Sequence, residues 1–384
     1  MLLFLLACAP PPAPTRPPPD ACAVMATPAP GPLDTERAQS PDDPLALARL
    51  RIREARLTGD PGFYTLADTA VECALLRAPT DLDAQRLRAH LLIQFHQFAE
   101  AESVARAMLS GPVAQPHWLD HALLGDALME QGKLDAAGEA YQAAVNLRPG
   151  LEMYDRIGWL RWLWGDVEGA LEMQRLAVGA GSSLDPEPFA WVLTRLGWLN
   201  ALSGRPAPEL DAALTLVPDY PPARFARGRA RLASGDKAGA IEDLTAAGPT
   251  VEAIWALSEA GVTPARTVTA VRAQDPRGYA IWLTNQPGGA AEAVALLEAE
   301  LKIRQDPVTR MALAYARFQA DPGVRDALRP EAESILGIGL AEPRVLFQAG
   351  LLLSDPALLA RALAAGPGLL PSERDLATFT PEDR

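Results

Sequence analysis

The apolar residues of this chain recur at intervals of three and four from about Asp42 onward. This spacing places them along one face of an α-helix. No stretch shows the sustained alternation of apolar and polar residues that is typical of β-strands. The pattern therefore predicts an all-α protein, in which successive amphipathic helices bury their apolar faces against one another.

Paired glycines punctuate this helical pattern. In each pair the second glycine follows the first by seven residues, and the pairs recur about every 30 to 40 residues, which is the period of solenoid proteins. A glycine within a helix lets another helix approach closely, and a glycine after it ends the helix in a left-handed conformation. Four such pairs predict repeated helix-turn-helix units: Gly125 and Gly132, Gly158 and Gly165, Gly197 and Gly204, Gly228 and Gly235.

One unit, residues 118–151, contains the whole arrangement. Leu124 and Gly125 lie in its first helix, Gly132 at the turn, and Tyr141 in its second helix between small residues, before Pro149. This unit resembles the tetratricopeptide repeat. The resemblance implies an α-solenoid, a superhelix of about eight or nine helix-turn-helix repeats, with a concave groove lined by the first helix of each repeat. Such a groove implies a scaffold that binds a peptide or a helix of a partner protein.

Composition divides the chain into five segments. A signal-like segment covers residues 1–8, and a proline-rich linker, predicted to be disordered, covers 9–41. The repeat array follows over 42–250, with the best repeats in 118–250. Divergent helical repeats are expected over 251–371, and a polar tail over 372–384.

The amino-terminal segment predicts a membrane anchor. Residues 1–7 are apolar but too short to span a bilayer. The run Leu5, Leu6, Ala7 and Cys8 resembles the lipobox of bacterial lipoproteins, which implies acylation of Cys8 and a place in the cell envelope. Because Ala9 follows the cysteine, the outer membrane is expected, on its periplasmic side or its surface. A cytoplasmic repeat adaptor with a misplaced start is the alternative.

The net charge and the number of cysteines limit the kinds of partner and metal site that the chain can have. With 35 Lys and Arg against 48 Asp and Glu, the net charge of −13 argues against nucleic acid. Three cysteines and four histidines exclude arrays of zinc fingers. Cys73 is expected to be a packed thiol, and a disulfide between Cys22 in the linker and Cys73 is expected not to form, because a flexible partner gains little from closure.

Five residues are candidates for partner binding, because aromatic and arginine side chains dominate binding hot spots. The alternative is that the tryptophans fill gaps between helices. Exposure of Trp159 and Trp198, at equivalent repeat positions, distinguishes the two. The candidates are Trp159, Trp162, Trp191, Trp198 and Arg229.

A metal-binding protein or a hydrolase is the rival function. Its site would lie in the irregular region 250–287 or among the histidines between His90 and His121. His117 and His121 are four residues apart, but the Glu that follows the first His in zinc hydrolases is absent. Neither a phosphate-binding loop nor a nucleophile elbow occurs in the sequence. We therefore expect no enzyme activity and no cofactor.

Overall fold

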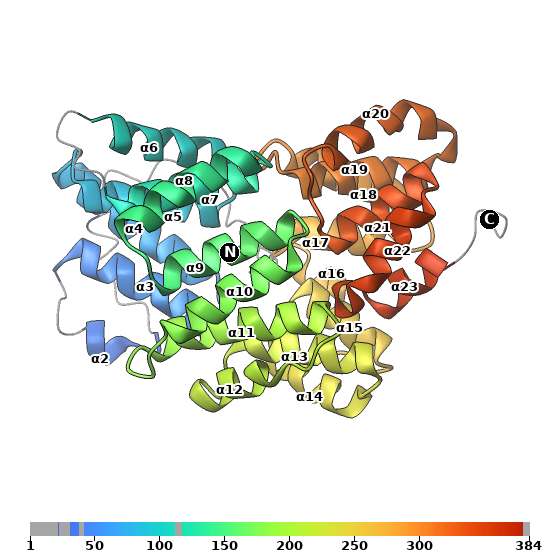
Figure 1. The fold of residues 1–384 in the computed structure, drawn as a ribbon, viewed down its shortest axis with the longest axis horizontal. Helices are drawn as coiled ribbons and strands as arrows, with labels where there is room; N and C mark the ends of the chain where they lie inside the picture. The colour runs from blue at the N-terminus through green and yellow to red at the C-terminus, as the bar shows by residue number, and fades with distance from the viewer. Residues whose placement is uncertain (1–21, 23–30, 38–41, 112–116, 379–384) are drawn as a thin grey trace.

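The chain is an α-solenoid. A computed structural model describes residues 22, 31–37, 42–111 and 117–378, and within these residues every regular element is a helix. Nine antiparallel helix pairs follow one another along the described chain, which agrees with the eight or nine repeats predicted. Figure 1 shows these pairs stacked side by side.

The first six pairs follow a short helix, α2 (Asp34–Arg37). They are α3 (Pro44–Thr58) with α4 (Gly62–Arg77), α5 (Leu82–Gln94) with α6 (Phe98–Ser110), α7 (Trp118–Glu130) with α8 (Leu134–Leu147), α9 (Leu151–Leu163) with α10 (Val167–Gly179), α11 (Pro186–Leu202) with α12 (Pro208–Leu216), and α13 (Pro221–Ser234) with α14 (Lys237–Ala246).

The carboxyl-terminal part is less regular. Short helices α15 (Val251–Glu259) and α16 (Val268–Val271) occupy the region in which the repeats are hard to recognise from sequence. The remaining elements are α17 (Pro276–Thr284) with α18 (Ala290–Glu300), α19 (Pro307–Ala320) with α20 (Arg325–Leu336) after η1 (Pro322–Val324), α21 (Pro343–Leu353) with α22 (Pro356–Ala364), η2 (Gly366–Gly368), and α23 (Pro371–Thr378).

The glycine pairs act as predicted. Gly125 lies inside α7, where an added Cβ would come 2.4 Å from the ring of Tyr141 on α8. Gly132 follows α7 with φ +76°, in the left-handed region that glycine enters without strain. The turn glycines of the other three pairs share this conformation: Gly165, Gly204 and Gly235.

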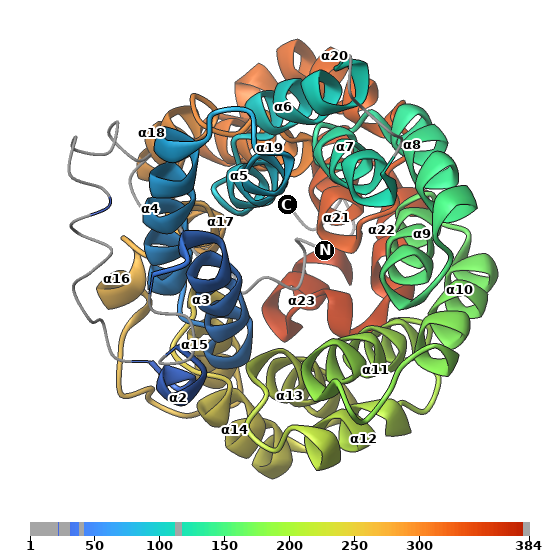
Figure 2. The same cartoon turned by 90° about the vertical axis from the view of Figure 1, so that its left-hand side faces the viewer.

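The pairs wind around a central axis. Figure 2 shows the first helices α3, α5, α7, α9, α11 and α13 on the inside of the ring and their partners on the outside. The carboxyl-terminal helices then pack against the ends of earlier ones. The amide of Ala341 donates to the carbonyl of Leu163 (2.7 Å), and the amide of Ser372 donates to Glu259 Oε2 (3.0 Å). Successive turns of the superhelix are therefore in direct contact.

Asp275 makes stability depend on pH. This residue caps α17, accepting a hydrogen bond from the amide of Gly278 (2.8 Å), and is 3% exposed. Burial raises its pKa to about 7, against the opposing charge of Arg277. A carboxyl whose pKa is raised by folding contributes stability below its unfolded pKa of about 4, and that contribution is lost as the pH rises through the folded pKa.

We therefore expect Asp275→Asn, which keeps the cap, to reduce the loss of stability between about pH 4 and pH 8. Thermal unfolding of the wild type and the variant at a series of pH values measures this loss of stability. Burial also raises the pKa values of Asp68 and Glu130, to about 6 and about 7. These two residues are present in both proteins, so the difference between the two stability curves is due to Asp275. Parallel curves for the two proteins would contradict this assignment.

One expectation about the amino-terminal segment is wrong, and another does not apply to the described residues 31–37. Helix α2 lies inside the linker that was predicted to be disordered, and the amide of Leu33 donates to Glu54 Oε1 of α3 (3.0 Å). Cys22 forms a disulfide with Cys73 of α4, so the prediction that this bond does not form is wrong. The contacts of Leu33 and Glu36 with Glu54 and Arg53 of α3 hold residues 31–37 in place, which a free linker would lack.

The remaining expectation about this segment concerns the anchor. Cys8 lies outside the described residues. Within the described part of the chain, no helix combines the length and the apolar character needed to cross a bilayer.

Candidate functional site

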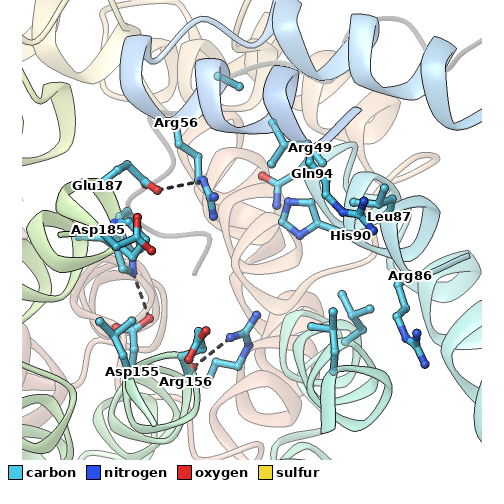
Figure 3. A pocket seen from close by; sticks show the side chains of 18 of the residues that line it. Arg49, Arg56, Arg86, Leu87, His90, Gln94, Asp155, Arg156, Asp185 and Glu187 are labelled. Carbon is cyan, nitrogen blue, oxygen red and sulfur yellow. Dashed lines mark hydrogen bonds and ion pairs between the residues drawn. The ribbon is translucent and has the colours of Figure 1, made fainter. Parts of the chain in front are cut away.

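A cavity of about 760 Å³ lies inside the first turn of the superhelix. Side chains from α3, α5, α7, α9 and α11 and from the start of α13 form most of its lining, with Tyr64 of α4 and Arg277 of α17. Most of its wall therefore comes from first helices. Its lining mixes apolar residues, such as Ile52, Leu119 and Leu123, with arginines and carboxylates. Figure 3 shows the charged side chains pointing inward from opposite sides.

Two arginines of the wall are held by carboxylates. Arg86 of α5 donates to both oxygens of Asp120 (2.6 and 3.1 Å). Arg156 of α9 donates from Nε and Nη2 to Asp126 (2.9 and 3.0 Å). Because these pairs join neighbouring first helices, they fix the spacing of the wall and leave its arginine charges compensated.

A third pair bridges the cavity. Arg56 of α3 lies with its Nε 3.5 Å from Glu187 Oε2 of α11, although α3 and α11 belong to different repeats far apart in sequence (Figure 3). The hydroxyl of Tyr220 also donates to Glu187, at 3.4 Å. The first repeat and the fifth therefore meet over the cavity through side chains, which closes one side of the groove.

Gln94 and His90 of α5 face this cavity with unsatisfied polar atoms. Gln94 is 7% exposed, and neither its Oε1 nor its Nε2 has a hydrogen-bond partner among the described residues. His90 Nε2 is also buried and has no hydrogen-bond partner among the described residues. Burial and the charge of Arg56 lower the pKa of His90 to about 3, so its imidazole is neutral near pH 7.

A buried ionic network supports the α9–α11 side of the wall. Asp155 of α9 accepts hydrogen bonds from Arg195 Nε (3.2 Å), Trp191 Nε1 (3.1 Å) and Gln174 Nε2 (3.0 Å). Arg195 is fully buried, and its guanidinium lies 3.8 Å from the centre of the Trp159 ring. Although burial raises the pKa of Asp155, the charge of Arg195 and the hydrogen bonds from Trp191 and Gln174 together outweigh it and hold the pKa below its ordinary value.

The tryptophans proposed as partner-binding residues are mostly core residues. Trp159 is 2% exposed and stacks on Trp162 at 4.6 Å, and Trp198 is 8% exposed. Neither Trp159 nor Trp198 is accessible, so the expected exposed patch is not present. The physical reason is that Arg195 covers the ring of Trp159 and that both rings belong to the packed core between the helices. Trp191 is partly buried and lines the cavity.

Arg229 is also a buried residue with contacts inside the protein. It is 3% exposed, pairs with Glu252, and donates to the carbonyl of Pro367 at 2.7 Å. Arg344 of α21 joins the same Glu252 (3.2 Å), and the two arginines lower the pKa of this carboxyl to about 2 despite its burial. Arg229 thus ties α13 to the carboxyl-terminal helices instead of facing a partner.

The histidines are dispersed. His117 caps α7, where its Nδ1 accepts from the amide of Leu119 (3.3 Å), and His96 lies in the turn between α5 and α6 with φ +62°. In the described part of the chain, no three His, Cys, Asp or Glu residues are grouped so as to hold a metal ion. The described residues therefore offer no set of ligands for the metal site of the rival function.

Sequence reasoning missed the polar stripe on α5. Arg86, His90 and Gln94 follow one another at intervals of four, which places them on one face of the helix. His90 and Gln94 flank the apolar run Leu91, Leu92 and Ile93. Polar residues on a first-helix face that should otherwise be apolar were the available signal.

The family comparison agrees with the repeat architecture. Residues 121–150 match the family model of the tetratricopeptide repeat. No curated protein matches the sequence significantly. A chain in the crystal structure of the APC/C hetero-tetramer Cut9–Hcn1 is similar at 14% identity and a TM-score of 0.43, over 89% of this chain, which spans 57% of that one. The P58(IPK) TPR domain is similar at 12% identity and a TM-score of 0.23, over 86% of this chain and 97% of its own length.

Proposed function

We propose that the protein is a scaffold that binds a peptide or a helix of a partner protein inside the first superhelical turn. Repeat solenoids use their concave surfaces for binding, and the tetratricopeptide match supports a role in protein–protein interaction. The cavity of about 760 Å³ carries the more specific proposal. Its size lies within the usual range of ligand sites, and its lining combines apolar surface with a few inward-facing polar groups.

Peptide selection tests this proposal. A random linear peptide library displayed on phage is panned on the full chain, and the affinities of selected peptides are measured by calorimetry. We expect Leu119→Asp, which places a charge on the cavity lining, to weaken binding about tenfold or more. Leu176→Asp is the matched control, because Leu176 lies on the second helix α10 and is 45% exposed. Equal affinities for the two variants would place the binding surface elsewhere.

We further propose that the scaffold is anchored to a bacterial envelope membrane through a lipid on Cys8, with the outer membrane favoured by Ala9. The disulfide between Cys22 and Cys73 supports an envelope location, because such bonds persist in oxidising compartments and are rare in the cytosol. The same observation speaks against the alternative of a cytoplasmic adaptor.

Detergent partitioning tests the anchor. We expect the full chain expressed in a bacterium to enter the detergent phase and Cys8→Ser to remain in the aqueous phase, because the variant lacks the acyl chains. Cys22→Ser is the control that removes a cysteine from the same segment without removing the acylation site. If the wild type and Cys8→Ser both remain in the aqueous phase, the anchor is absent.

A further inference from the structure

Gln94 and His90 form a pair of unsatisfied polar side chains on one face of α5. They are four residues apart, both line the cavity, and Figure 3 shows them beside each other beneath α3. The pair presents three buried atoms without hydrogen-bond partners among the described residues: Gln94 Oε1, Gln94 Nε2 and His90 Nε2.

Leaving such atoms unpaired is costly. An unsatisfied buried donor or acceptor costs about 1–3 kcal/mol, and native proteins retain few of them. Gln94 lies in the last turn of α5, where a methionine or leucine would continue the apolar run without that cost. A polar group at this position is therefore explained by a ligand that satisfies it.

The charges nearby indicate what kind of ligand fits. Arg86, Arg156 and Arg56 each lie against a carboxylate, so the arginines of this region are compensated. Arg56 Nε and Arg277 Nε also lack hydrogen bonds, but their charges are paired with Glu187 and Asp306. The side chains with neither a hydrogen-bond partner at these atoms nor a charge to compensate are the neutral amide of Gln94 and the neutral imidazole of His90. A ligand group with its own donor and acceptor side by side satisfies this pair better than an isolated anion does.

We propose that Gln94 and His90 bind the main chain of a peptide in an extended conformation. The N–H and C=O of one residue in an extended strand point to the same side, as in the hydrogen-bonded pairs of antiparallel sheets. The carboxamide of Gln94 then accepts from that N–H through Oε1 and donates to that C=O through Nε2. His90 Nε2 pairs with the next main-chain group on the same side. This inference rests on the proposed peptide-binding function and specifies how the site would read its ligand.

Main-chain recognition has two consequences that distinguish it from recognition of an acidic peptide. Selected peptides should share little sequence at the segment that contacts α5, because every residue offers the same main-chain groups. Their affinity should change less than about threefold between about 50 and 500 mM salt, because no net charge is being neutralised.

The test uses a peptide selected on the full chain together with versions methylated at one main-chain nitrogen at a time. We expect methylation at one position to weaken binding to the wild type about tenfold and to leave binding to Gln94→Met nearly unchanged. Methionine matches the shape of glutamine without its amide, so this variant should fold at least as stably as the wild type. Gln142→Met, on the exposed side of α8, is the matched control.

Three results overturn the inference. Selection of no peptide removes the proposed function and this inference together. If the selected peptide and all of its methylated versions bind the wild type and Gln94→Met with equal affinity, the main-chain contact does not exist, but the peptide-binding function still stands. A loss of affinity of more than about tenfold over the same salt range indicates an acidic ligand instead.

Discussion

Replacement of Asp155 by alanine is expected to lower the free energy of unfolding by about 3–5 kcal/mol. The change leaves the guanidinium of Arg195 charged and fully buried without its partner at 3.2 Å. It also removes the side-chain acceptor for Trp191 and Gln174. Loss of a single partner from a buried pair is costly because the remaining charge is not solvated. Denaturation in urea, followed by circular dichroism, measures the effect.

Two further variants serve as controls for this experiment. Glu168→Ala breaks the exposed pair with Arg205, whose side chains are 73% and 38% accessible, and should cost less than about 1 kcal/mol. Adding Arg195→Met to Asp155→Ala should recover part of the loss, because the uncompensated charge is then gone. If Asp155→Ala is no more destabilising than Glu168→Ala, the network does not contribute as described.

Gly125→Ala should destabilise the protein by about 1–3 kcal/mol, since it overpacks the contact between α7 and α8. The new methyl group would lie 2.4 Å from the ring of Tyr141. That ring is fully buried, and its hydroxyl donates to Asp126 at 2.7 Å, so it has little freedom to move away.

Gly179→Ala is the matched control, because Gly179 ends α10 and an added Cβ there meets no atom within 4 Å. This variant should be neutral or more stable by up to about 1 kcal/mol, the usual difference between alanine and glycine in a helix. The same denaturation curves measure both changes. Equal stability of the two variants would show that the close approach at Gly125 is not required.

The local structure of the repeats could be predicted from the sequence because short-range rules determine it. Gly125 and Gly132 mark a helix interior and a left-handed turn, as their spacing indicated. Helical periodicity and turn conformation depend on neighbours a few residues away, which the sequence displays directly.

The site could be predicted only in outline. The sequence indicated that first helices line a groove, but it did not show that Arg195 would cover Trp159 or that Arg229 would reach the carbonyl of Pro367. The first contact depends on how adjacent repeats pack, and the second on the cumulative twist of many repeats, which brings together residues 138 positions apart. Gln94 carried no local signal beyond its spacing from His90, because the lack of a partner is a property of the folded surroundings.

If Cys8 carries the proposed lipid, the bond between Cys22 and Cys73 limits how far the body of the protein can move from the membrane. A fully extended chain covers at most about 3.6 Å per residue, so the distance from Cys8 to Cys22 cannot exceed about 50 Å. With the bond reduced, the next fixed contact is that of Leu33 with Glu54, and the limit rises to about 90 Å. With the proposed anchor, oxidation therefore confines the body of the protein to a layer about half as thick beside the bilayer and about doubles its concentration there, which favours partners held in the same membrane.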